Sequence, residues 1–375
     1  MLTRRVDKRG ILEMIIGIDD RTTKNQYKGR GIGNYTRHII EWLPKVGADV
    51  EIETTDFSRA DVFLQPNFWD GFPIRLGSAS GGWQIPVPKV LMIHDFVPLA
   101  TKRFSERGPL VNFAKGVLYR LKMQNIKKAE AVLVNSDNTK KDVVRFAGAD
   151  PEKIHRVYLG VDEEFRTQSP VPREERGNCV LFVGGVEVNK NVLRLLQAFA
   201  NLRSISNIQY SVSNIKYSIS NIRLIIPGGQ FVNEEKIETK MIKAKVKELG
   251  LENNVEFPGF VPQEKLIELY RKALVFVYPS YYEGFGFPVL EAMASGTPVV
   301  SSNASSLPEV GGDAVTYVDP FDVEGIAKEI ERVLYYHATE YGKYEKMVKD
   351  GLEQSKKFSW QKCAKETLEV LRTTI

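Results

Sequence analysis

Short apolar runs alternate with amphipathic segments along almost the whole chain. Runs such as IIGID (15–19), KVLMIHD (89–95) and CVLFVGG (179–185) have the length and β-branched content of buried strands. Between them, apolar residues recur at helical spacing, as in NYTRHIIEWL (34–43). Strands that alternate with helices in this way predict an α/β fold with doubly wound parallel sheets.

The chain is too long for one hydrophobic core. It has 375 residues, whereas single cores stop growing at roughly 250–300 residues. The segment 167–178 (TQSPVPREERGN) is polar, contains prolines and has no periodicity, so it is expected to be a linker. We expect one domain over 14–166 and a second over 179–345, followed by a C-terminal helix in 346–375. Residues 1–13 are polar and basic and are expected to be an extension.

Composition narrows the class of protein. Hydrophobic residues make up 43% of the chain and charged residues 26%, as in ordinary soluble proteins. The two cysteines, Cys179 and Cys363, have neither disulfide nor metal-site spacing, which favours a reducing cytoplasm. No apolar run approaches the roughly 18 residues of a membrane span. The net charge is only +5 and no nucleic-acid-binding motif is visible, so nucleic acid is not an expected partner.

The most informative segment follows the apolar run ALVFVYPS, a predicted buried strand that ends at Ser280. It reads YYEGFGFPVLEAMASGTP, with two glycines that allow close approach of a ligand and a short helix that starts near Pro288. Amides and the dipole at a helix N-terminus favour a phosphate group. Glu283 lies on the loop, and Glu291 is expected in the first turn, where it can accept both hydroxyls of a ribose. The spacing alone is also compatible with a solvated loop charge and a helix-dipole contact.

This segment resembles the E-x7-E block of the retaining GT-B glycosyltransferases of family 4, which include many bacterial mannosyl- and glucosyltransferases. Further blocks follow in the family's order: IGIDDR, GRGIGNYTRHI, VLMIHDFVP, AVLVNSDNTKKDV and VYLGVD, then FVGGVEVNKNVLRLLQAF, VEFPGFVPQEKLIELY and SSLPEVGGDAVTYVDPFD. The resemblance covers nearly the entire chain. It implies the GT-B architecture, in which two Rossmann-like doubly wound domains face a central cleft. The domain over 14–166 would be the acceptor side, the domain over 179–345 would bind the nucleotide-sugar, and helix 346–375 would pack back toward the N-terminal domain.

The resemblance also implies roles for residues. Glu291 would hold the ribose, Lys190 the diphosphate, and Glu283 and His94 the transferred sugar, which makes Glu283, His94 and Lys190 the expected catalytic residues. Further donor contacts are expected from glycine-rich loops, namely Gly31, Gly33, Gly284, Phe285, Gly286 and Phe287. Considered singly, Lys190 could be a solvated surface charge, and His94 could be satisfied by a backbone carbonyl. Asn135 and Ser136 end another apolar run, and their roles are less defined.

The chain departs from the family's pattern at one important position. The family's lysine usually acts with an arginine, but the two places where that arginine commonly stands hold Gly185 and Asn189. Three explanations remain open. Another basic residue such as Arg194 substitutes, donor affinity is low, or catalysis is impaired.

The expected activity is that of a retaining, metal-independent hexosyltransferase. The resemblance implies transfer of a hexose, with mannose suggested by the similarity to bacterial mannosyltransferases, from a GDP- or UDP-hexose co-substrate to a lipid-linked or cell-surface glycan. It also implies that neither a cofactor nor a metal is needed, and the sequence has no Asp-x-Asp motif that would suggest a metal. The alternative is a non-catalytic GT-B protein that binds a sugar or a nucleotide. A dinucleotide-dependent oxidoreductase is disfavoured because neither GRGIGNY nor FVGGVEVNK supplies the required G-x-G-x-x-G turn.

Two further segments are distinctive. The stretch Lys102–Lys128 interleaves apolar residues with eight basic residues against one acid, Glu106. Such a surface attracts anionic lipid headgroups, so a cytoplasmic protein in peripheral contact with the inner face of the membrane is one expectation, and a solvated helix face is the other. The second segment, 204–224, repeats SISNIQY, SVSNIKY and SISNIRL, whose composition favours strand or turn over a coiled coil. It is expected to be a short insertion, with a functional edge surface as the alternative.

Overall fold

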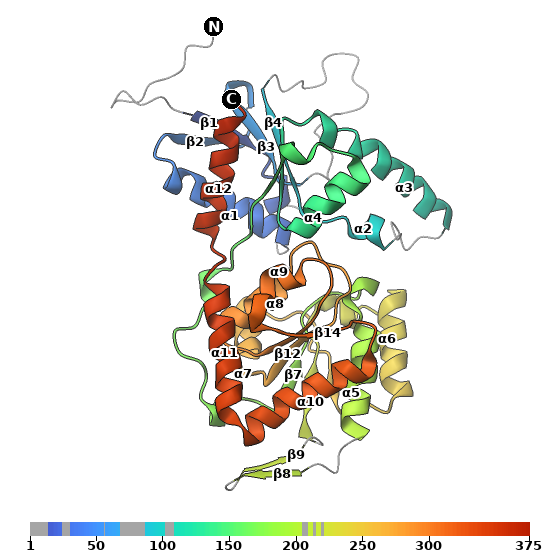
Figure 1. Ribbon diagram of the computed structural model, residues 1–375. Helices are drawn as coiled ribbons and strands as arrows, with labels where there is room; N and C mark the ends of the chain where they lie inside the picture. The colour runs from blue at the N-terminus through green and yellow to red at the C-terminus, as the bar shows by residue number, and fades with distance from the viewer. Residues whose placement is uncertain are drawn as a thin grey trace. The chain divides into compact units, whose positions relative to one another are not determined.

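The computed structural model shows two compact α/β units, which are described separately (Figure 1). One unit consists of the described residues up to Gly160 together with Phe358–Ile375, and the other of Val161–Lys357. The structure describes residues 14–24, 31–55, 57–67, 87–101, 109–204, 209–212, 215–218 and 221–375. The extension 1–13 and the basic residues 102–108 therefore lie outside the described residues.

The first unit is built on a six-stranded parallel sheet. Its strands are β1 (Met14–Ile18), β2 (Val50–Glu53), β3 (Val62–Gln65), β4 (Lys89–Ile93), β5 (Ala131–Val134) and β6 (Ile154–Arg156), in the order β2-β1-β3-β4-β5-β6. Its α-helices are α1 (Gly31–Val46), α2 (Val97–Ala100), α3 (Pro109–Met123), α4 (Asp137–Asp142) and α12 (Trp360–Thr373). The apolar runs form the central strands and are buried throughout in β3 and β5, as expected for a sheet covered on both faces.

The second unit repeats this plan. Its sheet has the order β11-β10-β7-β12-β13-β14, formed by β7 (Cys179–Leu181), β10 (Arg223–Ile225), β11 (Val255–Glu256), β12 (Val275–Tyr278), β13 (Val299–Ser302) and β14 (Thr316–Val318). Its helices are α5 (Val192–Ser204), α6 (Ile237–Glu248), α7 (Gln263–Lys272), α8 (Phe287–Ala294), α9 (Leu307–Gly311), α10 (Val323–Thr339) and α11 (Tyr341–Ser355). All strand pairs in both sheets are parallel. The predicted doubly wound α/β class is therefore confirmed.

The strand order of the second unit fixes where a ligand can bind. From β7 the chain proceeds to β10 and β11 on one side, then crosses back so that β12 pairs with the other side of β7. In open parallel sheets, ligands bind outside the carboxyl ends of the strands where the winding direction reverses. The loops after β7 and β12 therefore border the expected site.

The repeated segment forms strands where it is described. β8 (Gln209–Val212) and β9 (Ile215–Ser218) pair as an antiparallel hairpin beside α10, separate from the six-stranded sheet (Figure 1). This agrees with the preference for strand over coiled coil, because Ile, Val and Tyr suit a pleated surface.

The segment 167–178 is tied to the second unit by Arg176. Its guanidinium donates to the carbonyl oxygens of Ala273 and Gly296, at 3.0 and 2.8 Å, just after the ends of α7 and α8. A cation at these helix C-termini is favoured by the helix dipoles. Toward the C-terminus, α11 belongs to the second unit, whereas α12 lies in the first unit and packs on α1.

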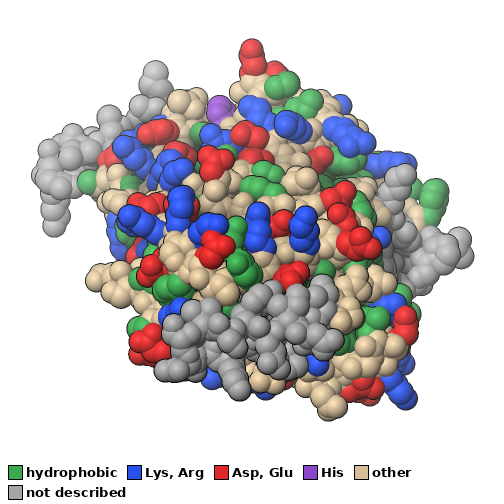
Figure 2. Space-filling view, turned by 60° about the horizontal axis from the view of Figure 1, so that its bottom comes forward, with side chains coloured by type: hydrophobic (Ala, Val, Ile, Leu, Met, Phe, Trp, Pro, Cys, Tyr) green, Lys and Arg blue, Asp and Glu red, His purple; other side chains and the backbone are tan. Residues whose placement is uncertain are grey.

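The surface carries charges of both signs. On the face drawn in Figure 2, Lys and Arg side chains are interspersed with Asp and Glu side chains. Among the described residues, no helix is both long enough and apolar enough to cross a lipid bilayer.

Candidate active site

Two asparagines join the loops after β7 and β12. The Asn189 amide donates to the carbonyl of Tyr282 at 2.9 Å, and the amide of Tyr281 donates back to the carbonyl of Asn189 at 2.9 Å. Asn191 takes a left-handed φ of 62° and donates to the carbonyl of Pro279 at 3.0 Å. Asparagine tolerates this backbone conformation better than most residues. The residue between them, Lys190, is therefore held over the end of β12.

Lys190, which is partly buried, and Glu283, which is buried, form an ion pair. The Lys190 ammonium donates to both carboxylate oxygens of Glu283, at 2.8 and 2.9 Å, and to the Tyr278 hydroxyl at 2.9 Å. The hydroxyls of Tyr278 and Ser280 donate to Glu283 Oε1 at 2.9 and 2.6 Å. Burial alone would lower the pKa of Lys190, but the Glu283 carboxylate and Tyr278 outweigh it and raise that pKa above its usual value. The ammonium of Lys190 is therefore positively charged.

Helix α8 begins directly after the glycine loop. Gly286 has φ of 120°, and a Cβ there would lie 2.7 Å from Cδ2 of Leu307, so the turn requires glycine. The residues from Gly284 to Phe287 bring their backbone to the helix N-terminus, as predicted from the sequence. The expectation that Glu291 lies in the first turn is wrong, because the helix already starts at Phe287 and Glu291 stands one turn further in.

Glu291 lies in an environment that favours its neutral form. Burial raises the pKa of its carboxyl from 4.5 to about 7, a hydrogen bond from Tyr270 opposes this shift, and the charge of Asp162 adds to it. The Tyr270 hydroxyl donates to Glu291 Oε2 at 2.8 Å. The carboxyl group can therefore change protonation near neutral pH.

One of the two positions at which the family's arginine commonly stands, Gly185, lies against a carboxylate. A Cβ built on Gly185 would collide with the carboxylate of Glu187. Arg194, considered above as a substitute, donates to Asn191 Oδ1 at 3.0 Å and lies 4.9 Å from the ring centroid of Phe321. Arg194 is therefore engaged beside the loop rather than on the Lys190–Glu283 pair.

The remaining predicted residues lie in the first unit. His94 is buried at the end of β4, with Nε2 2.9 Å from the carbonyl oxygen of Pro66, and it packs edge-on against Tyr35. Burial lowers the pKa of His94 to about 4, although the Pro66 carbonyl opposes this, so the ring is neutral and its Nε2–H donates. This is the carbonyl contact considered as the alternative. Gly31 and Gly33 lie in the first turn of α1, where Gly33 is buried.

The structure thus pairs Lys190 with Glu283 and places the loop 284–287 and Glu291 in the same unit, whereas His94, Gly31 and Gly33 lie in the first unit. Sequence reasoning missed several supporting residues, namely Tyr270, Tyr278, Ser280, Ser305 and Ser306. Tyr278 and Ser280 could have been found, because they precede Glu283 in the same YPS segment. The other three lie 21 to 23 residues away in sequence from the glutamate that each contacts.

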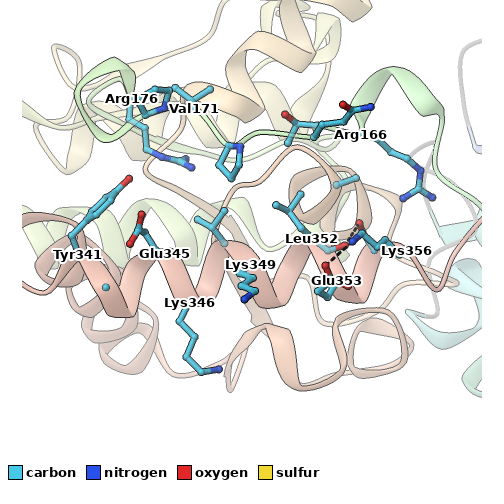
Figure 3. Close-up of a pocket in the computed structure, with 18 of the residues that line it drawn as sticks. Arg166, Val171, Arg176, Tyr341, Glu345, Lys346, Lys349, Leu352, Glu353 and Lys356 are labelled. Carbon is cyan, nitrogen blue, oxygen red and sulfur yellow. Dashed lines mark hydrogen bonds and ion pairs between the residues drawn. The ribbon is translucent and has the colours of Figure 1, made fainter.

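The described residues contain no group of three or more His, Cys, Asp or Glu side chains that could hold a metal ion. A groove of about 1140 Å³ lies elsewhere in the second unit, between residues 163–176 and α11 (Figure 3). Arg166, Arg176 and Lys349 are among its lining residues, and none of the predicted site residues is.

Comparison with known families decides what kind of protein carries this site. The family described as Glycosyl transferases group 1 matches residues 163–353, which is 191 of the 375 residues. The chain belongs to this family. The family described as Glycosyltransferase Family 4 matches residues 59–165, so the two matches together span parts of both units of this group 1 glycosyltransferase.

Two curated relatives of this group 1 member are mannosyltransferases of Escherichia coli. O-antigen chain mannosyltransferase B is 31% identical over 253 residues, covering 65% of this chain and 61% of the relative. Serotype-specific mannosyltransferase WbdA is 28% identical over 322 residues, covering 82% of this chain. The chain spans only 61% and 36% of the lengths of these two relatives.

Solved structures show the shared fold. The HepE protein of Anabaena, in complex with UDP-glucose, is similar with a TM-score of 0.69 at 17% identity, covering 96% of this chain and 99% of HepE. The predicted GT-B architecture of two Rossmann-like units is thereby confirmed at the level of fold.

Proposed function

We propose that this protein is a retaining hexosyltransferase that moves a hexose, with mannose as the first candidate, from a nucleotide-sugar to a hydroxyl group of a glycan. One observation carries the proposal. The Lys190–Glu283 ion pair lies where the winding direction of the sheet reverses, beside the N-terminus of a helix that carries Glu291. The cation and the helix N-terminus are complementary to the diphosphate of a nucleotide-sugar, and the two carboxylates are complementary to the hydroxyls of its ribose and its hexose.

Each part of the donor has a complementary group. The proposal places the diphosphate on Lys190 and on the backbone of Gly284–Phe287, because a helix N-terminus and an ammonium both favour phosphate. It places the ribose hydroxyls on Glu291 and the sugar hydroxyls on Glu283. The two mannosyltransferase relatives favour mannose, whereas HepE was solved with UDP-glucose, so both GDP- and UDP-hexoses are candidate donors.

The proposed reaction retains the configuration at the anomeric carbon. The bond from this carbon to the diphosphate oxygen breaks, the acceptor oxygen attacks from the same face, and its proton passes to a diphosphate oxygen. Lys190 would stabilise the departing diphosphate, and Glu283 the positive charge that develops on the sugar. His94, Gly31 and Gly33 of the first unit are assigned to the sugar and acceptor side. The proposal includes neither a metal ion nor a cofactor.

The acceptor is proposed to be lipid-linked, so the protein would work at the inner face of the cytoplasmic membrane. Helix α3 supports this because it exposes an apolar stripe at helical spacing: Phe113 is 72% exposed and Leu121 65%, with Val117 between them. The exposed basic residues Lys115 and Arg120 lie on the same helix. A helix that carries both exposed apolar side chains and exposed basic side chains suits the interface of an anionic bilayer.

Incubation with GDP-mannose, UDP-glucose or ADP-glucose and octyl α-mannoside as the acceptor probe tests the activity. We expect a product heavier by one hexose with one of these donors, detected by mass spectrometry, and a rate lowered by at least about tenfold in Glu283→Gln. Nucleotide binding with neither transfer nor donor hydrolysis would favour the non-catalytic alternative, which the lack of the family's arginine at both Gly185 and Asn189 motivates. Absence of binding by all three donors would overturn the proposal.

A further inference from the structure

Ser305 has a backbone conformation that its residue type disfavours. Its φ is 53°, and among the described residues Asn191 is the other non-glycine residue with a positive φ. For an L-residue the left-handed region costs roughly 1–2 kcal/mol, whereas glycine enters it without this cost. Both residues lie in loops next to the Lys190–Glu283 pair. Because glycine would adopt this backbone conformation more easily, the presence of serine indicates that its hydroxyl group has a structural or functional role.

The hydroxyl of Ser305 contacts the backbone of Glu283. The loop after β13 brings Ser305 Oγ to 2.8 Å from the backbone nitrogen of Glu283, which donates to it. The next residue, Ser306, has its Oγ 3.0 Å from the carbonyl oxygen of Glu283 and 2.8 Å from that of Phe285. Two successive serines therefore hold the main chain on both sides of the Glu283 side chain.

These contacts complete the restraint on Glu283. Its carboxylate is fixed by Lys190, Tyr278 and Ser280, and only 8% of the residue is exposed. Those side chains determine where the oxygens can point, but they do not fix the peptide group from which the side chain extends. The Ser305 contact does so from a loop that is 22 residues away in sequence. A group that acts electrostatically on a reacting sugar must be held within a fraction of an ångström.

We propose that Ser305 is a positioning residue that sets the location of the Glu283 carboxylate relative to the reacting sugar. This inference rests on the proposed role of Glu283. The left-handed backbone of Ser305 directs its hydroxyl at the Glu283 amide. The protein tolerates the free-energy cost of this conformation because the contact fixes the Glu283 loop.

The substitution Ser305→Gly separates this role from a structural one, because it removes the hydroxyl and also relieves the backbone. We expect the midpoint of thermal unfolding to be unchanged or higher, kcat for hexose transfer to fall about tenfold, and KM for the donor to change less than about twofold. Ser305→Asn, which tolerates a positive φ and offers an amide oxygen as acceptor, should recover part of kcat. An unchanged kcat in Ser305→Gly, or a fall in kcat accompanied by a lower unfolding midpoint, would overturn the positioning role.

The variant Glu283→Gln, assayed in the same way, shows whether a negative result concerns the positioning role of Ser305 alone or the proposed function as well. If Glu283→Gln lowers kcat and Ser305→Gly does not, only the positioning role is wrong. If Glu283→Gln also leaves kcat unchanged, the role of Glu283 is wrong and the role of Ser305 fails with it.

Discussion

The Lys190 ammonium lies 2.8 Å from Oε1 and 2.9 Å from Oε2 of Glu283, so one cation serves both carboxylate oxygens. The side chains are 19% and 11% exposed, which leaves little water to solvate either charge alone. Bringing two charges out of water is costly, and each depends on the other for compensation. Under the proposed function, a donor diphosphate that binds Lys190 would share this cation with Glu283, so binding at the diphosphate end would be coupled to binding at the sugar end.

This mutual dependence predicts strong coupling between variants. Lys190→Met leaves the Glu283 charge buried without its cation, so we expect it to lower the free energy of unfolding by about 3 kcal/mol. Lys190→Met combined with Glu283→Gln should lose less than Lys190→Met alone, because the neutral amide no longer needs a counter-charge. Urea unfolding of the four proteins, followed by tryptophan fluorescence, measures the coupling. Additive losses would show that the two side chains are independent.

The pKa of Glu291 predicts a pH-dependent affinity for nucleotide. An ionised carboxylate accepts ribose hydroxyls better than a carboxylic acid, and burial raises the pKa of Glu291 to about 7. Affinity for GDP or UDP should therefore fall by up to about tenfold from pH 8 to pH 6, as the ionised fraction falls. Calorimetric titrations at both pH values measure this. Since phosphate groups also titrate, the comparison is with Glu291→Gln, which should bind more weakly at pH 8 and vary less with pH.

The raised pKa of Glu291 also makes the free energy of unfolding depend on pH, but this stability falls as the pH rises, whereas the nucleotide affinity increases. Between pH 4.5 and about 7 the unfolded chain ionises Glu291 while the folded protein keeps it protonated. The stabilisation due to this proton is complete below pH 4.5 and is lost as the pH rises through about 7. As the pH rises over this range, the unfolding midpoint of wild type should therefore fall relative to that of Glu291→Gln. A difference that is constant with pH would contradict the raised pKa.

Much of this site follows from local sequence, and the remainder depends on long-range contacts. The glycine loop, the short helix and the pair Glu283 and Glu291 lie within one segment, so their spacing predicts most of their geometry. The ion pair joins positions that are 93 residues apart, and it becomes visible only once the strand order puts β12 beside β7. The Ser305 contact depends on a loop conformation that residue preferences disfavour, so no pattern of apolar and polar positions indicates it.

A substitution at Gly286 tests the role of the N-terminus of α8. Gly286→Ala places a Cβ 2.7 Å from Cδ2 of Leu307 and forces an L-residue into φ of 120°. We expect a loss of about 1–3 kcal/mol in the free energy of unfolding and a weaker affinity for GDP or UDP, since the backbone that is proposed to bind the diphosphate must move. Gly342→Ala is the matched control, because Gly342 lies in α11 and the added Cβ would meet no atom within 4 Å other than its chain neighbours and the backbone of its own helix. It should be neutral or stabilising by up to about 1 kcal/mol. Similar losses in both variants would refute a special role for Gly286.

Helix α3 predicts binding to anionic membranes. Wild-type protein should co-sediment with vesicles of phosphatidylglycerol and phosphatidylcholine, and much less with phosphatidylcholine alone. Phe113→Ser and Leu121→Ser each remove a large exposed apolar side chain, so each should weaken binding by about tenfold. Lys115→Glu and Arg120→Glu should weaken it further at low salt, because each nearby cation contributes about 1 kcal/mol at an anionic surface.

The control for this test comes from another exposed helix. Ile237 and Met241 of α6 are 60% and 52% exposed, so Ile237→Ser and Met241→Ser remove comparable apolar area from the second unit. If α3 is the membrane contact, these variants should bind vesicles like wild type. Equal loss in both helices would indicate non-specific hydrophobic adsorption, and unchanged binding in the α3 variants would place the contact elsewhere. Because octyl α-mannoside needs no bilayer, transfer to this acceptor should remain at the wild-type rate in Phe113→Ser and Leu121→Ser, which separates membrane docking from catalysis.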